Sequence, residues 1–74
     1  MEFDTEKIDE AVLALLYLTL HGDRAWKSFD WNAMNRLHEK GFISNPVGKA
    51  KSVRLTEEGL RESERLFTKL FVKK

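Results

Sequence analysis

Residues 30–60 read DWNAMNRLHEKGFISNPVGKAKSVRLTEEGL, and they carry the signals for a helix, a hairpin and the start of another helix. Asp30 is a good N-cap, because its carboxylate can accept hydrogen bonds from the free N–H groups of a first helical turn. Gly41 is a good helix stop, since a glycine just past a helix takes the left-handed conformation without steric cost. Together they predict a helix over residues 31–40.

The second part of this stretch predicts a hairpin and then a helix. Proline fixes φ and glycine permits a positive φ, so residues 45–48, Asn-Pro-Val-Gly, suit a turn. Residues 52–55 alternate polar and apolar side chains, as in a strand with one buried face. Thr56 is then an N-cap, and the acidic first turn that follows suits the positive end of a helix over residues 57–72.

The residues before this stretch predict one more helix and an ambiguous segment. Gly22 would stop a helix that begins at Asp4 or Thr5 and ends at His21. At about 100° per residue, the face of this helix expected against the core comprises Ile8, Ala11, Val12, Leu15, Leu18 and Thr19. Residues 21–29 suit either a helical turn or a short strand against the hairpin, and we expect Trp26 and Phe29 to pack inward.

Two pieces of the chain resemble winged-helix transcriptional regulators of the MarR and PadR type. NRLHEKGFI at 35–43 is similar to the end of a recognition helix, and VRLTEEGL at 53–60 is similar to the junction of the wing and the last helix. The local signals and this resemblance imply one compact winged-helix-like domain over residues 1–74, mainly α with a small β-hairpin (α+β). Its three main helices would have the hairpin between the second and the third. The chain departs from the pattern in one respect, because it leaves room for one turn at most where a separate helix normally precedes the recognition helix. As a whole, it also resembles a small family of uncharacterised bacterial proteins.

The resemblance implies DNA binding by the central helix and the hairpin, often as a dimer, and the charge pattern agrees. Residues 1–30 carry three basic and seven acidic side chains, a net charge of −4, whereas residues 31–56 carry five basic ones against Glu39, a net charge of +4. Asparagine can pair with adenine and arginine with guanine in the major groove, and basic side chains of a hairpin can contact phosphates. The candidate DNA contacts are Asn32, Asn35, Arg36, Lys49, Lys51 and Arg54.

The candidate DNA-contact residues can also have roles that involve no DNA. The helix face can be a solvated one with Arg36 paired to Glu39, and lysines on an exposed hairpin discourage strand pairing between molecules. Winged helices also serve as docking modules, because one fold hosts many functions. The alternative function is therefore a protein–protein interaction module or small adaptor with no DNA binding, which the acidic first third of the chain favours.

No pattern in the sequence indicates catalysis. The chain has no cysteine, its only histidines, His21 and His38, are too far apart for a local metal pair, and it lacks a glycine-rich phosphate-binding motif. We therefore expect a protein that is not an enzyme and has no cofactor, metal or small-molecule substrate. The apolar run over 11–20 is shorter than the about 20 residues of a membrane span, and the N-terminus is acidic, unlike a signal peptide. We expect a cytoplasmic protein.

The apolar side chains exceed what one small core can cover, which predicts a homodimer. A 74-residue domain gains only roughly 3–5 kcal/mol from its core, and each buried leucine adds roughly 1.5–3 kcal/mol. A two-fold contact through the first and last helices would bury the excess reciprocally. The candidate interface residues are Leu13, Leu16, Tyr17, Leu20, Leu66 and Leu70. The alternative is a monomer in which the loop bearing Trp26 and Phe29 covers this stripe.

Overall fold

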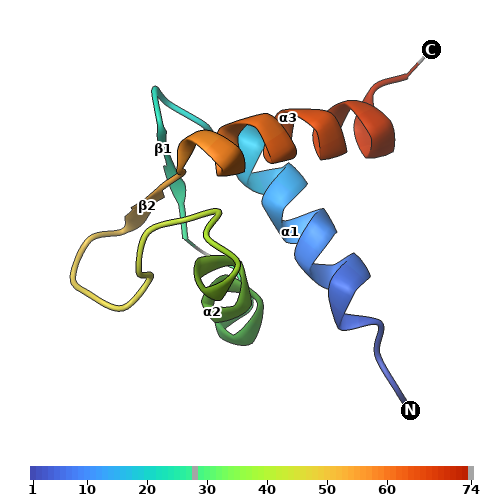
Figure 1. The fold of residues 1–74 in the computed structure, drawn as a ribbon, viewed down its shortest axis with the longest axis horizontal. Helices are drawn as coiled ribbons and strands as arrows, with labels where there is room; N and C mark the ends of the chain where they lie inside the picture. Colours follow the sequence, from blue (N-terminus) through green and yellow to red (C-terminus); the bar gives the residue numbers. More distant parts are fainter. Residues whose placement is uncertain (28, 74) are drawn as a thin grey trace.

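The computed structural model describes residues 1–27 and 29–73, which form three helices and a small antiparallel sheet (Figure 1). In chain order the elements are α1 (Thr5–Leu18), β1 (Arg24–Trp26), α2 (Trp31–Glu39), β2 (Ser52–Arg54) and α3 (Glu57–Phe71). The expected fold class, mainly α with a small β component, is confirmed. The described residues measure 38 × 35 × 19 Å, so the molecule is flat and most of its side chains lie close to the surface.

The helix boundaries follow from the capping residues that the sequence indicated. The Asp30 carboxylate accepts from the Ala33 amide at 3.0 Å and begins α2. Gly41 has φ +82°, and the amides of Gly41 and Phe42 bond back to His38 and Leu37 at 3.0 Å, which is the Schellman pattern that ends a helix. α2 therefore begins and ends where the sequence predicts, to within one residue.

The segment between α2 and α3 turns back on itself, as expected of a hairpin. Its two arms are joined by a bridge between Ile43 and Leu55 and by a 2.8 Å bond from the Ser44 amide to the Arg54 carbonyl. The second arm, β2, also pairs with β1 in antiparallel register, with Ala25 opposite Val53. Of the two alternatives for residues 21–29, the short strand is thus the one observed over β1.

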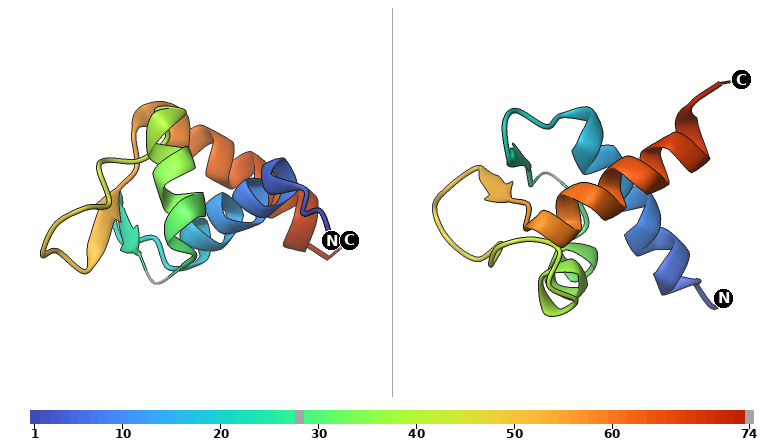
Figure 2. Two further views of the ribbon diagram at one scale, coloured as in Figure 1. Left: turned by 90° about the horizontal axis from the view of Figure 1, so that it is seen from below. Right: turned by 45° about the horizontal axis from the view of Figure 1, so that its top comes forward.

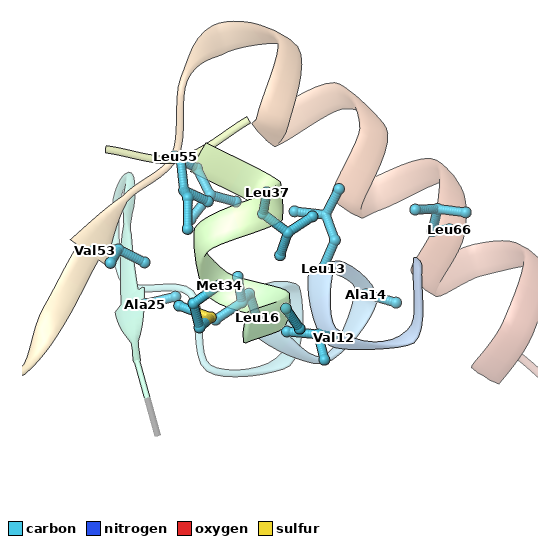
Figure 3. Close-up of a cluster of buried hydrophobic side chains, with 12 residues drawn as sticks. Val12, Leu13, Ala14, Leu16, Ala25, Met34, Leu37, Val53, Leu55 and Leu66 are labelled. Carbon is cyan, nitrogen blue, oxygen red and sulfur yellow. The ribbon is translucent and has the colours of Figure 1, made fainter. Parts of the chain in front are cut away.

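The core lies between the sheet, α1 and α2, and continues to α3 (Figure 3). Met34 and Leu37 of α2 sit in its centre, with Ala25 and Val53 of the sheet on one side and α1 on the other. α3 crosses over α1 (Figure 2), and Ala14 is fully buried there because its small side chain lets the two helices approach closely. Both α2 and α3 therefore pack against α1, which is the central element of the fold.

The prediction of which face of α1 lies against the core was correct only in part, since Val12 is buried and Ile8 packs against the core. Leu13 and Leu16, expected on the outside, are 1% and 0% exposed, whereas Leu18, expected inside, is 65% exposed. The reason is that α1 is covered on two sides, by α2 with the sheet and by α3, so its buried surface extends round most of the helix. The helix also ends earlier than expected, at Leu18, where the Thr19 amide bonds to the carbonyl of Leu16.

α3 begins against the backbone of Phe42. The Thr56 amide donates to the Phe42 carbonyl at 3.0 Å, and the Thr56 hydroxyl donates to the Gly41 carbonyl at 2.6 Å. Gly59 is buried at the same contact, where an added Cβ would lie 1.9 Å from the Phe42 carbonyl oxygen. The glycine of the LTEEG segment is thus explained by the close approach of α3 to the chain that leaves α2.

Candidate nucleic-acid interface

The exposed face of α2 carries two of the residues expected to contact bases. Burial of Ala33, Met34 and Leu37 fixes how the helix is turned, and it leaves Asn32 and Glu39 exposed and Asn35 half-buried on the opposite face. Both asparagines come from one helical face, since positions three and four apart are neighbours on a helix. This face can present amide groups to a partner, with one carboxylate beside them.

Arg36, which lines one depression together with Asn32, extends its side chain from α2 to α1. Its Nε donates to both carboxylate oxygens of Asp9 at 3.0 and 2.8 Å, and its Nη2 donates to Oδ1 at 2.8 Å. Lys40 adds a bond from Nζ to Oδ2 at 3.1 Å. We call Asp9, Arg36 and Lys40 the Asp9 cluster. Arg36 is therefore paired with Asp9, and the pairing with Glu39 considered from the sequence is not the one observed.

Asp9 is the residue of this region that sequence reasoning missed. Its side chain is 2% exposed, while Arg36 and Lys40 keep 32% and 43% of theirs in contact with solvent. Burial by itself would raise the pKa of Asp9, but the hydrogen bonds and charges of Arg36 and Lys40 outweigh it and lower the pKa below the ordinary 3.8. The helical spacing of the sequence could have indicated its burial, because Asp9 lies three residues before Val12 and four before Leu13, on the face of α1 that is buried.

The loop between the hairpin arms, residues 45–51, carries two exposed lysines, Lys49 and Lys51. We call it the wing loop. It is shaped by an Asn45 side chain that accepts from the Val47 amide at 2.9 Å. The Lys27 ammonium donates to the carbonyls of Pro46 at 2.7 Å and Gly48 at 3.0 Å, so the residue that follows β1 is bonded to the loop. The lysines expected to contact phosphates thus lie exposed on a loop whose backbone is bonded to the side chains of Lys27 and Asn45.

Arg54 is exposed on β2 but has an intramolecular partner. Its Nε donates to Asp23 Oδ2 at 2.6 Å, and this hydrogen bond is the main reason that the pKa of Asp23 lies below 3.8. Across the strand pair lies Arg24, whose Nε donates to the Ser52 hydroxyl at 2.9 Å. An exposed pair of this kind adds little to stability because water screens it, so Arg54 could exchange Asp23 for another anion at little loss.

The two tryptophans are not core residues. Trp26, expected inward, is 53% exposed, and Trp31 is 49% exposed. Successive side chains of a strand point to opposite faces, and Ala25 takes the inward position of β1. Phe29, by contrast, is partly buried and packs against the core as expected.

The six residues expected at a dimer interface fall into two groups. Leu13, Leu16 and Leu66 are at most 2% exposed within a single chain, which corrects the expectation that they are free to meet a second copy. Tyr17 and Leu20 are half-buried, and the ring of Tyr17 packs at 5.2 Å from that of Phe67. Leu70 is 47% exposed and is the one member of the set that lies fully at the surface.

The described residues contain no group of three or more histidines and carboxylates placed to hold a metal ion. Within residues 1–27 and 29–73, no helix combines the length and the hydropathy that crossing a membrane requires.

The pattern of a domain family of unknown function, DUF6429, matches residues 4–73. The chain belongs to this family. It is also similar to the uncharacterized protein y4hR of Sinorhizobium fredii, with 62% identity over 74 residues that cover 99% of this chain and all of y4hR. No solved structure matches the DUF6429 chain. Membership in an uncharacterised bacterial family is thus confirmed, and because the family's description carries no activity, any function rests on the geometry above.

Proposed function

We propose that this protein binds duplex DNA, with α2 facing the bases and the wing loop contacting the phosphate backbone. The observation that carries the proposal is that α2 and the basic wing loop lie next to each other, on the side of the molecule away from the end of α3 (Figures 1 and 2). In this arrangement Asn32 and Asn35 would read base edges, while Lys49 and Lys51 would meet phosphates.

The resemblance to MarR- and PadR-type regulators supports the proposal. It implies a winged-helix arrangement, and the chain has a helix, a strand, a second helix, a hairpin and a last helix in that order. No helix precedes α2 between Leu18 and Trp31 in the described residues, so the brace that such a helix gives on the DNA backbone is missing. In this chain the Asp9 cluster ties α2 to α1 and so fixes the position of α2.

Two of the expected contacts enter the proposal in a reduced role. Arg36 is held by the buried Asp9, so we assign it to fixing α2 and remove it from base recognition. Arg54 is paired with the exposed Asp23, and we assign it a phosphate contact that forms only when that pair opens. The proposal includes no catalytic step and no cofactor, and it places the protein in the cytoplasm.

A fluorescence-anisotropy titration of labelled duplexes tests the proposal. Affinity should fall steeply with salt, and removing both Lys49 and Lys51 should reduce the slope of log K against log salt by about 1.8, which is about 0.9 for each lost phosphate contact. Asn35→Ala should change the preference among sequences. Lys73→Ala, a cation at the far end of the chain, is the matched control and should leave the slope unchanged. Absence of binding at tens of micromolar protein and low salt would overturn the proposal.

The alternative is a protein–protein interaction module, and one observation favours it. Glu39 is exposed on the same face of α2 as Asn32, where a carboxylate would repel DNA phosphates. A pull-down that yields one stoichiometric protein partner, together with no affinity for any duplex, would select this alternative over DNA binding.

We also propose a homodimer that uses α1 and α3, with a revised set of contacts. Leu18, Leu70, Phe71 and Val72 are each 46% or more exposed. Lys7, Glu10 and Lys69 border the depression beside Leu70 and Phe71, so both signs of charge are present at its rim. A surface with both signs can meet its own copy across a two-fold axis, where each lysine faces a carboxylate of the partner.

A further inference from the structure

A hollow of about 590 Å³ lies beside the sheet, between the end of α1 and the start of β2. Its lining includes Leu18, His21, Arg24, Trp26, Lys51 and Ser52. The hollow is formed by the end of α1 and by the two strands, and α2 contributes nothing to its lining. It is thus a surface that the proposed base-reading helix does not use.

The lining combines an exposed aromatic ring with cations. Trp26 keeps 53% of its surface exposed, although β1 has a buried position next to it that Ala25 occupies. Arg24 is fixed in place by its 2.9 Å bond to the Ser52 hydroxyl, and Lys51 is exposed at the base of the wing loop. The hollow therefore offers an exposed indole together with two cationic side chains.

Acidic side chains are absent from the described lining of the hollow. Asp23, the carboxylate next to Arg24 in sequence, is bonded to Arg54 and lines a different depression. A hydrophobic peptide would gain little from this charge, whereas a ligand that joins a planar ring to an anion complements both features. A nucleotide has that combination, because every base has a face that stacks on an aromatic ring and every phosphate is an anion.

We infer that this hollow binds an unpaired segment of a DNA strand, with one base stacked on the Trp26 indole and the adjoining phosphates on Arg24 and Lys51. The occupant is a strand because the two cations come from separate segments, β1 and the wing loop, so that successive phosphates of one backbone can each meet one of them. The inference goes beyond the duplex contacts of α2. Lys51 belongs to both surfaces, so a duplex held by the wing loop would present a neighbouring unpaired end to Trp26.

The test measures binding of a short oligothymidylate. In a Trp31→Phe background, Trp26 is the only tryptophan, and stacking should quench its fluorescence as the oligonucleotide is added. By anisotropy, Trp26→Ala should weaken single-strand binding roughly 5- to 150-fold, which is the range for losing one stacked base. Trp26→Phe should restore most of the affinity because it keeps an aromatic face.

The controls separate this inference from duplex binding. Trp31→Ala removes an equally exposed indole from α2 and should leave single-strand binding unchanged, while Arg24→Ala should weaken it. Duplex affinity should be unchanged in Trp26→Ala, since no duplex contact is assigned to that ring. Circular dichroism of each variant confirms that the fold is retained.

Three results would overturn the inference. The first is oligothymidylate binding without quenching of Trp26, and the second is equal single-strand affinity of Trp26→Ala and the wild type. The third is equally strong binding of thymidine monophosphate, which would make the ligand a free nucleotide and refute the strand. If the duplex binds and the oligothymidylate does not, this inference fails while the duplex proposal stands.

Discussion

Replacing Gly59 by alanine sets two effects of opposite sign against each other. Gly59 lies in the first turn of α3 with helical backbone, and alanine is favoured over glycine in a helix interior by about 0.8–1.0 kcal/mol. The added Cβ, however, would lie 1.9 Å from the oxygen, 2.8 Å from the carbonyl carbon and 3.1 Å from the Cα of Phe42. All three are backbone atoms, so no side chain can rotate away to relieve the contact.

The clash should outweigh the gain in helix propensity. α3 and the chain at Phe42 would have to separate by more than about 1 Å before the oxygen reached an ordinary contact distance. That movement strains the 3.0 Å bond from the Thr56 amide to the Phe42 carbonyl, which joins the same two segments. Overpacking typically costs about 1–3 kcal/mol. With the strained bond added and the propensity gain subtracted, we expect Gly59→Ala to lower the free energy of unfolding by about 2 kcal/mol.

Urea denaturation followed by far-UV circular dichroism measures this difference. In a thermal scan the same change should lower Tm by about 8–16 °C, since about 1 kcal/mol corresponds to about 4–8 °C in a domain of this size. Arg61→Ala, an exposed position on the same helix, is the control and should stay within about 0.5 kcal/mol of the wild type. A Gly59→Ala protein as stable as the wild type, or more stable, would show that the close approach of α3 to Phe42 does not limit this position.

Two further predictions concern the Asp9 cluster and the dimer. Because the pKa of Asp9 is lowered in the folded state, its contribution to stability is present above the unfolded pKa near 3.8 and is lost as pH falls through the lower folded value. Asp9→Asn should therefore lower the free energy of unfolding by about 1–3 kcal/mol at neutral pH, less than for a fully buried ion pair because Arg36 and Lys40 reach solvent. The difference from the wild type should shrink below about pH 4, and urea titrations at several pH values check this, with a pH-independent difference refuting it. Light scattering after gel filtration should give about twice the 8.7 kDa mass of the chain for the wild type. Leu70→Glu should halve the measured mass, because an unpaired charge would enter an apolar interface. A wild-type mass of one chain would refute the dimer.

The features of the fold that depend on only a few neighbouring residues were predictable from the sequence. Asp30, Gly41 and Thr56 each determine a helix end through bonds to residues at most five positions away, so their chemistry fixes the outcome locally. The alternation along β2 was equally informative, with Val53 buried and Arg54 exposed. The helix–hairpin–helix order followed from these signals.

Contacts between distant segments were not predictable in the same way. α1 is apolar round most of its circumference, and periodicity alone cannot say which side its neighbours cover. Only the positions of α2 and α3 determine that Leu13 is buried and Leu18 is exposed. The pairing of Arg36 with Asp9 spans 27 residues, so nothing near Arg36 in the sequence distinguished it from a free arginine.

The candidate site was therefore predicted in part. Asn32, Lys49 and Lys51 are exposed as expected, because their positions follow from a helix phase and from a turn. Trp26 was expected to pack inward and is exposed, although the two-residue period of a strand would have placed it on the face opposite Ala25.

The bonds from Lys27 to the wing loop mean that its shape is determined by the folding of the chain itself. A free loop must lose about 1–2 kcal/mol of conformational entropy for each residue that a ligand orders. Here the Lys27 ammonium already bonds to the carbonyls of Pro46 and Gly48. Part of the conformational entropy of the loop is therefore lost when the chain folds, and it need not be lost again when a partner binds. The same tether couples the loop to β1, and a shift of the strand would carry Lys49 and Lys51 with it. The wing loop is thus a preorganised extension of the sheet.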